Sequence, residues 1–395
     1  MNICGIVCEY NPFHNGHRYL IDECRRILGE ESAVVCVMSG DFVQRGEAAA
    51  YCKHDRARAA VAGGADLVLE LPLPWSVASA ERFARGAVGL LGASGAVTHL
   101  AFGSESGDLP MLRETAATLA RSETDALIRE AMAEGISYAA ARQRAVETLS
   151  GGAAGALTQP NDILAVEYLK AVATLKLRMT PLAVARQGAG HDEMAEGCFP
   201  SAAMLREKLR SGQTVGPWMP EASLKALEEG AGPLDPAAIE TALLSRLRFL
   251  SEADFAAAPD VSEGLERRVF AAARTAPTLC DAVAAAASKR YPNARIRRIL
   301  LCAALGLRAS DGEGIPPYLR LLAANARGLS VLRAMEERTS LPILAKPAHV
   351  RTLDDRAQRV FALGAAAADL AALGCRAPEQ RRGDRDWRAA PAILD

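Results

Sequence analysis

The feature that most constrains the fold lies in the first 28 residues, where an apolar run, a proline break and an amphipathic segment follow one another. Residues 3–7 predict a buried strand, Asn11-Pro12 interrupts it, and residues 15–28 carry apolar side chains at intervals of three and four. This order of strand, turn and helix is how α/β nucleotide-binding folds open. The chain is therefore predicted to begin with such a fold.

Two histidines stand at the predicted turn. His14 and His17 are three residues apart at the start of the expected helix, where backbone N–H groups and the helix dipole favour anions. Gly16 would let a phosphate approach the backbone closely. A polyphosphate site is one interpretation, and a packed or solvent-facing histidine pair fits the spacing equally well. A zinc site has less support, because the spacing is not HExxH and no further His or paired Cys is near.

Three further apolar segments repeat the opening pattern. Residues 33–38, 66–71 and 97–102 predict strands, and residues 53–62 and 75–91 predict the helices between them. Four strand–helix alternations in about 105 residues predict a Rossmann-like, doubly wound parallel sheet.

Polar residues follow the ends of these strands, where open parallel sheets place ligands. The predicted crevice is lined by residues 10–17, 39–47 and 103–105. A solvated loop is the alternative for residues 39–47, which include Asp41 and Glu47.

Three later positions extend this crevice. Asn161 begins a predicted helix, and either it or its neighbour Asp162 is expected to be the N-cap. Residues 181–186 predict a fifth strand that delivers Arg186 to the edge of the sheet, followed by a mobile loop at 187–192. Ser201 is a suitable N-cap for the next helix.

Charge and cysteine usage set the broad class. The 46 basic and 47 acidic residues nearly balance, so a nucleic-acid partner would need a local basic patch. The nine cysteines include no CxxC and several lie in apolar runs, which is typical of a reducing compartment. Neither a signal peptide nor an apolar run of about eighteen residues is recognised. A cytoplasmic protein without membrane contact is expected.

The pattern changes after residue 215. Prolines punctuate the chain, and residues 216–378 predict a mostly α-helical domain with no strand, followed by a loosely ordered tail at 379–395. Between residues 266 and 308, nine basic residues face two acidic ones, and Tyr291 lies among them. Such a segment suits phosphate contacts and base stacking, although an arginine-rich solvated face is the alternative. The candidate RNA-binding residues are Lys289, Arg290, Arg295, Arg297 and Arg298.

Five strings follow one another along the chain: VCEYNPFHNGHRYL, SGDFVQRGEAA, PNDILAVEYLKA, SAAMLR and SKRYPNARIRRIL. Together they resemble the bacterial tRNA(Met) cytidine acetate ligase family of the HxGH nucleotidylyltransferase superfamily. The resemblance extends from Asn2 to about Lys346. Two positions depart from the family pattern: Ala48 replaces a proline, and Ala203 replaces the second hydroxyl of a Ser/Thr-rich helix start.

The resemblance implies a ligase that activates acetate with ATP as acetyl-adenylate. It would then acetylate N4 of the wobble cytidine of elongator tRNA(Met), releasing AMP and pyrophosphate. Residues 1–215 would form the ATP-binding domain, residues 216–378 would bind tRNA, Mg²⁺ would accompany ATP, and no obligate protein partner is indicated. ATP binding would involve Val7, Tyr10, Asn11, Pro12, Phe13, His14, Asn15, Gly16, His17, Leu20, Gly103, Asn161, Arg186 and Ser201.

The expected catalytic residues are His14, His17, Asp41 and Arg206. Asp41, with Glu105 as the alternative, is the candidate general base of the transfer. Two other functions stay open: an adenylyltransferase for a small phosphorylated metabolite, which would not need the basic helices, and a non-catalytic RNA-binding protein.

Overall fold

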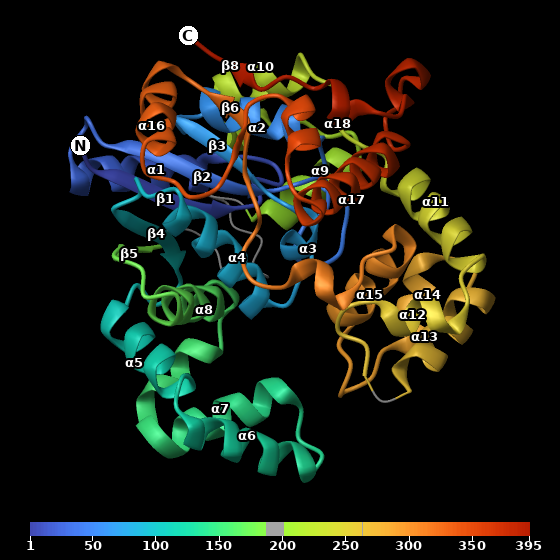
Figure 1. The fold of residues 1–395 in the computed structure, drawn as a ribbon. Coiled ribbons are helices and arrows are strands. Elements are labelled where there is room, and N and C mark those ends of the chain that lie inside the picture. The colour runs from blue at the N-terminus through green and yellow to red at the C-terminus, as the bar shows by residue number, and fades with distance from the viewer. Residues whose placement is uncertain (187–200, 263) are drawn as a thin grey trace.

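The molecule is built on one central sheet (Figure 1). In the computed structural model, which describes residues 1–186, 201–262 and 264–395, the strand order is β5-β4-β1-β2-β3-β6-β7, with β8 paired to β6. Strands β1 to β5 run parallel, which confirms the predicted parallel sheet. The strands are β1 (Ile3–Cys8), β2 (Ala33–Ser39), β3 (Leu67–Leu71), β4 (His99–Ser104), β5 (Thr180–Ala185), β6 (Leu319–Ala324), β7 (Ile343–Leu344) and β8 (Ala392–Ile393).

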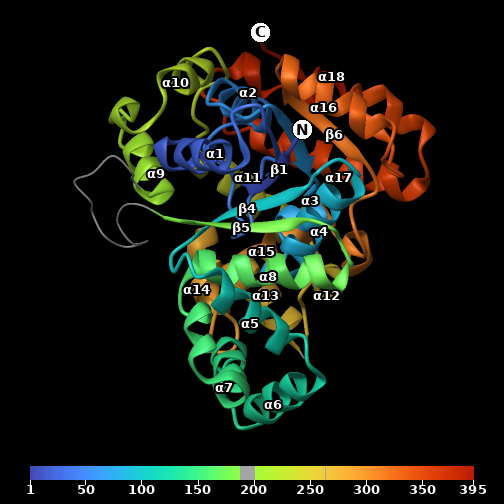
Figure 2. The same cartoon turned by 90° about the vertical axis from the view of Figure 1, so that its left-hand side faces the viewer.

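Helices cover both faces of the sheet and continue beyond it (Figures 1 and 2). Those before residue 187 are α1 (Asn15–Leu28), α2 (Lys53–Ala62), α3 (Leu73–Ser76), α4 (Ala80–Ala93), α5 (Leu109–Leu119), α6 (Ser122–Ala133), α7 (Tyr138–Ser150) and α8 (Pro160–Thr174). Those after it are α9 (Ala202–Arg210), α10 (Glu221–Glu228), α11 (Pro236–Arg248), α12 (Glu252–Ala257), α13 (Leu265–Thr275), α14 (Leu279–Ala286), α15 (Asn293–Leu305), α16 (Ala326–Glu336), α17 (Asp355–Ala372) and α18 (Arg385–Arg388).

Each central strand feeds two cores, because successive side chains of a strand point to opposite faces of the sheet. On β2, Val35 and Val37 belong to the core that includes α4 and α8. Cys36 and Met38 belong to the core formed with α1 and α2. Both faces of the parallel strands are therefore buried, which explains why these segments read as continuous apolar runs.

Two groups of helices project from this body. Helices α5, α6 and α7 extend from α8 away from the sheet in both views (Figures 1 and 2). Helices α11 to α15 pack around a core of their own that includes Leu243, Val269 and Ile299, and α17 adds Leu363 to it. The predicted, mostly helical C-terminal part is confirmed. The proposed domain boundaries after residues 215 and 378 stay predictions.

The expectation of no strand after residue 216 is wrong. Strand β6 pairs antiparallel with β3 and so joins the central sheet. Its six residues are all buried, and a short apolar run cannot be told from a buried helical segment by periodicity alone.

The expectation of a loosely ordered tail is also wrong. Residues 379–395 form α18 and β8, and Asp386 is only 1% exposed. The polar composition suggested disorder, but Asp386 is buried because Lys53 and Arg320 compensate its charge. Among the described residues, no helix combines the length and hydropathy needed to cross a membrane.

Candidate active site

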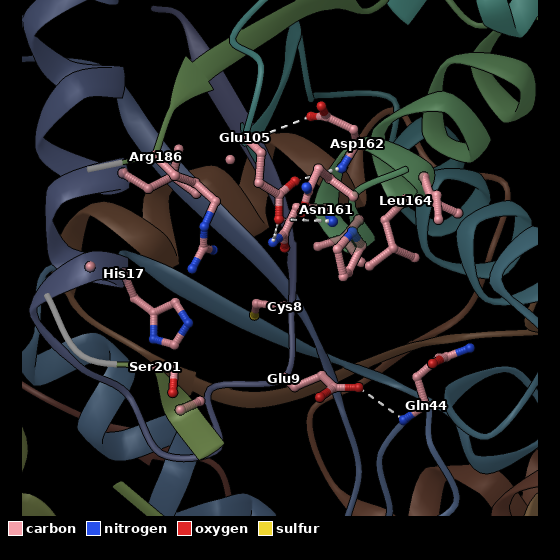
Figure 3. A pocket seen from close by; sticks show the side chains of 18 of the residues that line it. Cys8, Glu9, His17, Gln44, Glu105, Asn161, Asp162, Leu164, Arg186 and Ser201 are labelled. Atoms are coloured by element: carbon pink, nitrogen blue, oxygen red, sulfur yellow. Dashed lines mark hydrogen bonds between the residues drawn. The ribbon is translucent and has the colours of Figure 1, made fainter. Parts of the chain in front are cut away.

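A cavity of about 950 Å³ lies at the carboxyl ends of β1, β4 and β5. The segments that follow these strands form its walls together with the starts of α1, α8 and α9 (Figure 3). This is the edge at which the sequence predicts the ligand site. The predicted residues that line the cavity are Val7, Tyr10, Asn11, His14, Gly16, His17, Leu20, Gly103, Asn161, Arg186, Ser201 and Arg206.

The two histidines are held by the backbone at the start of α1. His14 is the N-cap, and its Nδ1 accepts a hydrogen bond from the N–H of Gly16 at 3.1 Å. Nδ1 of His17 accepts from the N–H of His14 at 3.2 Å. An accepting imidazole nitrogen carries no proton, so each neutral ring bears its proton on Nε2. The rings stack with their centroids 3.7 Å apart.

Burial keeps both rings neutral. The pKa of His14 is lowered to about 3, chiefly by burial and in addition by the positive charges of Arg186 and Arg206. The pKa of His17 also lies well below its usual value, first because of burial and then because of His14 and Arg186. The two rings can therefore donate hydrogen bonds through Nε2 but carry no positive charge.

Two arginines supply the positive charge that the histidines lack. Arg186 directly follows β5, and Gly103 at the end of β4 leaves room for its side chain. Arg206 on α9 donates a hydrogen bond to the carbonyl of Asn11 at 3.0 Å. Ser201 caps α9 by accepting from the N–H of Met204 at 3.2 Å. The residues predicted to hold the ATP phosphates come from the start and the middle of the chain and meet at this one cavity. They are His14, His17, Arg186, Ser201 and Arg206, and together they are called the phosphate cradle.

The wall formed by β4 and α8 is fastened by two carboxylates (Figure 3). Glu105 accepts hydrogen bonds from the side chain of Asn161 at 2.6 Å and from the N–H of Asp162 at 2.9 Å. Asp162 in turn accepts from the hydroxyl of Ser104 and from the N–H groups of Glu105 and Ser106. Asn161 thus lines the cavity from the first turn of α8, while Asp162 ties that helix to the end of β4. The N-cap of α8 is Gln159, so the expectation that Asn161 or Asp162 is the cap is wrong.

Four of the residues predicted for ATP binding or catalysis do not line the cavity. Asp41 is buried and accepts from the N–H of Lys53 at 2.8 Å, so its position gives no support to a base facing the crevice. Phe13 is fully buried in the core, and Asn15 contacts the carbonyl of Pro217 at 3.4 Å. Pro12 is part of the turn after β1, where it is buried and does not line the cavity.

Sequence reasoning missed several cavity residues. Glu9 directly follows β1, and its position at a strand end was the available signal. Tyr168, Phe83 and Met111 bring apolar surface from three different helices. Their spacing resembles any buried helix face, so the sequence carried no signal for them. The predicted loop at residues 187–192 lies outside the described residues.

The five candidate RNA-binding residues of the basic segment are either exposed or bound to other parts of the protein. Lys289 and Arg290 are exposed. Arg295 donates to the carbonyl of Asp260 at 2.7 Å, and Arg298 lies 3.8 Å from the carboxylate of that residue. Arg297 is ion-paired at 2.5 Å with Glu47, which lines the cavity. This pair joins α15 to the cavity wall, so the basic segment and the histidine site are neighbours. Whether these five residues bind RNA stays a prediction.

A family model described as HIGH nucleotidyl transferase matches residues 1–386. The chain belongs to this family. Among its relatives are proteins named tRNA(Met) cytidine acetate ligase, which confirms the resemblance found in the sequence. The one from Syntrophomonas wolfei is 35% identical over 99% of both chains, and the one from Acetivibrio thermocellus is 33% identical over 98% of both.

Solved structures agree with this HIGH nucleotidyl transferase assignment. The fold matches apo TmcAL of Thermotoga maritima with a TM-score of 0.93 and 31% identity over the whole of both chains. A second structure of that protein, bound with alpha-thio ATP, matches with a TM-score of 0.91. The predicted nucleotidylyltransferase type of α/β fold is therefore confirmed.

Proposed function

We propose that this protein is an ATP- and acetate-dependent tRNA(Met) cytidine acetate ligase. Its similarity to proteins of that name covers nearly the full length of the chains. The observation that carries the mechanism is the convergence of two neutral histidines and two arginines on one cavity. A small-metabolite adenylyltransferase would not need the exposed basic residues Lys289 and Arg290.

The first step is attack of an acetate oxygen on the α-phosphorus of ATP, which yields acetyl-adenylate and pyrophosphate. Negative charge builds on the α-phosphate and the departing pyrophosphate, so catalysis depends on positioning and on preorganised donors. The Nε2–H groups of His14 and His17 and the guanidinium groups of Arg186 and Arg206 supply these donors. Neutral imidazoles fit this task because they donate hydrogen bonds without needing a proton from solvent.

The second step transfers the acetyl group to N4 of the acceptor cytidine and releases AMP. Acetyl-adenylate is hydrolysed readily by water, so the tRNA should cover the cavity while the transfer occurs. Of the five candidate RNA-binding residues, Lys289 and Arg290 are exposed, and the guanidinium of Arg290 lies 5.6 Å from the Tyr291 ring centroid. We assign phosphate contacts of the tRNA first to these two residues.

We also propose that Mg²⁺ enters with ATP. The described residues contain no group of three or more His, Cys, Asp or Glu side chains that could hold a metal ion. Mg²⁺ is commonly held by substrate phosphates, waters and one or two carboxylates rather than by an all-protein cage. The cavity, with its donors for phosphate, suits an ion carried by the nucleotide, which would neutralise part of the phosphate charge.

The decisive experiment incubates the protein with ATP, labelled acetate and unmodified tRNA(Met). The expected result is labelled N4-acetylcytidine, formed together with AMP and pyrophosphate. A tRNA with uridine at the wobble position is the control, because it lacks the amine that accepts the acetyl group. Absence of both acetylated nucleoside and acetate-dependent AMP would contradict the proposal.

A further inference from the structure

The acetyl transfer needs a proton acceptor, and the described part of the cavity wall offers four carboxylates: Glu9, Glu47, Glu105 and Asp162. Two of them hold the protein together. Both oxygens of Glu105 accept hydrogen bonds from the start of α8, and both oxygens of Asp162 accept from the end of β4. Loss of these hydrogen bonds would loosen the cavity wall. Neither is suited to take up a proton during turnover.

Glu47 has a different partner. Its Oε1 lies 2.5 Å from Nη1 of Arg297, and the two side chains are 34% and 28% exposed. The guanidinium thus occupies one oxygen of this carboxylate. Glu47 therefore serves to join the cavity loop to α15.

Glu9 is the carboxylate that remains. Its Oε1 accepts one hydrogen bond, from the N–H of Gln44 at 2.9 Å, and no other hydrogen bond to this carboxylate is found in the described part of the chain. The side chain is partly exposed in the cavity. In Figure 3, Glu9 and Gln44 lie below the centre of the pocket, Glu105 and Asn161 above it, and His17 and Ser201 to the left.

The place of Glu9 suits the acceptor nucleotide. On one side, Arg206 of the phosphate cradle is close enough to influence the Glu9 carboxylate. On the other side, the loop of Gln44 continues to Glu47, which pairs with basic helix α15. A cytidine that enters the cavity along α15 would thus pass Glu9 before it reaches the reacting phosphate.

On the basis of the proposed function, we propose that Glu9 is the general base of the acetyl transfer. The N4 lone pair of the cytidine attacks the carbonyl carbon of acetyl-adenylate, and a C–N bond forms. The bond from that carbon to the phosphate oxygen breaks, and its electron pair leaves with AMP. The N4 proton passes to the Glu9 carboxylate, which later releases it to water.

The surroundings of Glu9 keep it basic enough for this role. Burial raises the pKa of Glu9 above its ordinary value, and the Gln44 N–H and the charges of Arg206, Arg56 and Arg45 offset only part of that rise. Burial and then the charge of Glu9 raise the pKa of Tyr168 on α8, so this cavity phenol stays neutral. The ionised, proton-accepting form of Glu9 is lost as pH falls through this raised pKa. The transfer rate should therefore fall at acidic pH.

The test compares the two half-reactions in Glu9→Gln, which keeps the shape of the side chain and removes its basicity. Acetate-dependent exchange of labelled pyrophosphate into ATP reports the first step without tRNA, and it is expected to stay within about threefold of wild type. Single-turnover transfer of acetyl to tRNA(Met) is expected to slow by about 10²–10⁴-fold. The fall in transfer rate at acidic pH should disappear.

Two further variants complete the design. Glu47→Gln removes a neighbouring cavity carboxylate and is expected to retain the acidic fall in rate. Glu9→Asp keeps a carboxylate, so it should retain that fall at a reduced rate, and it gives the answer where Glu9→Gln does not fold. The inference is overturned if transfer by Glu9→Gln is unchanged, if its pH dependence persists, or if exchange falls as much as transfer. Failure of wild type in both half-reactions would instead refute the proposed function.

Discussion

At the scale of single residues, the position of His17 depends on Tyr10, an aromatic neighbour with an unusual backbone conformation. Tyr10 has φ +45° and is 2% exposed. Its ring contacts Phe13 and His17 edge-on, with centroids 4.9 Å and 4.8 Å away. A residue other than glycine in this left-handed region costs about 1–3 kcal/mol, and such strain is found at functional sites. Packing of the Tyr10 ring offsets this cost and fixes the His17 ring at the cavity.

The lowered pKa of His14 predicts a pH dependence of stability. Its folded pKa of about 3 lies below the unfolded value, so between these values the unfolded chain binds more protons than the folded one. The free energy of unfolding therefore falls as pH drops below about 6.5, by about 2 kcal/mol at pH 5 from this residue alone. Urea unfolding should show that the free energy of unfolding of His14→Asn decreases between pH 7.5 and pH 5 by about 2 kcal/mol less than that of wild type.

Asparagine is the right replacement here because it caps helices well and still offers an oxygen to the Gly16 N–H. His349 is exposed, so His349→Asn is the matched control and should retain the wild-type pH dependence. Equal pH dependence in His14→Asn and wild type would show that this imidazole is not held neutral in the fold.

At the scale of elements, the contact between the cavity loop and α15 is unusually close. Gly46 has φ +76°, and a Cβ there would lie 2.8 Å from the backbone nitrogen of Arg298. Backbone atoms in a helix cannot give way as a flexible side chain can. The loop and the helix therefore fit only because residue 46 has no side chain, and the ion pair of Glu47 with Arg297 depends on that fit.

This contact predicts different costs for two glycine substitutions. Gly232 has a similar φ of +74°, with nothing within 4 Å of its Cβ position. Gly232→Ala should therefore show only the backbone strain, about 1 kcal/mol. Gly46→Ala should cost about 1–3 kcal/mol more, because the loop must move away from α15. Denaturant unfolding of both variants measures the difference, and equal costs would show that the contact yields without strain.

The sequence predicted elements well where one local pattern decides them. The strand, turn and helix around His14 follow from an apolar run and a proline, and the cavity forms where that pattern indicates. Contacts between distant segments were not predictable. Arg295 and Arg298 were predicted to bind RNA, yet Arg295 donates a hydrogen bond to Asp260 and Arg298 lies near the carboxylate of that residue. A run of charged residues in a sequence does not show which side chains have a partner within the protein.

At the scale of the whole molecule, a buried ion network ties the C-terminal segment to the sheet. Asp386 of α18 lies 2.5 Å from Nζ of Lys53 on α2 and 2.8 Å from Nη1 of Arg320 on β6. Glu70 on β3 contacts the same two cations at 2.7 and 2.8 Å. All four side chains are at most 4% exposed. Segments from both ends of the chain thus depend on one another, although each charge looks like ordinary surface charge in the sequence.

This network predicts that Asp386 contributes strongly to stability. Asp386→Ala leaves two buried cations that share the carboxylate of Glu70, so it should lower the free energy of unfolding by about 3–5 kcal/mol. Glu379→Ala, at an exposed position of the same C-terminal segment, should change it by no more than about 0.5 kcal/mol. Denaturant unfolding compares the two.

Asp386→Asn separates charge from shape, because it retains the volume and should still lose most of the stability. If both Asp386 variants behaved like Glu379→Ala, the C-terminal segment would dock without its charge, and apolar contacts such as that between Trp387 and Phe361 would hold it in place.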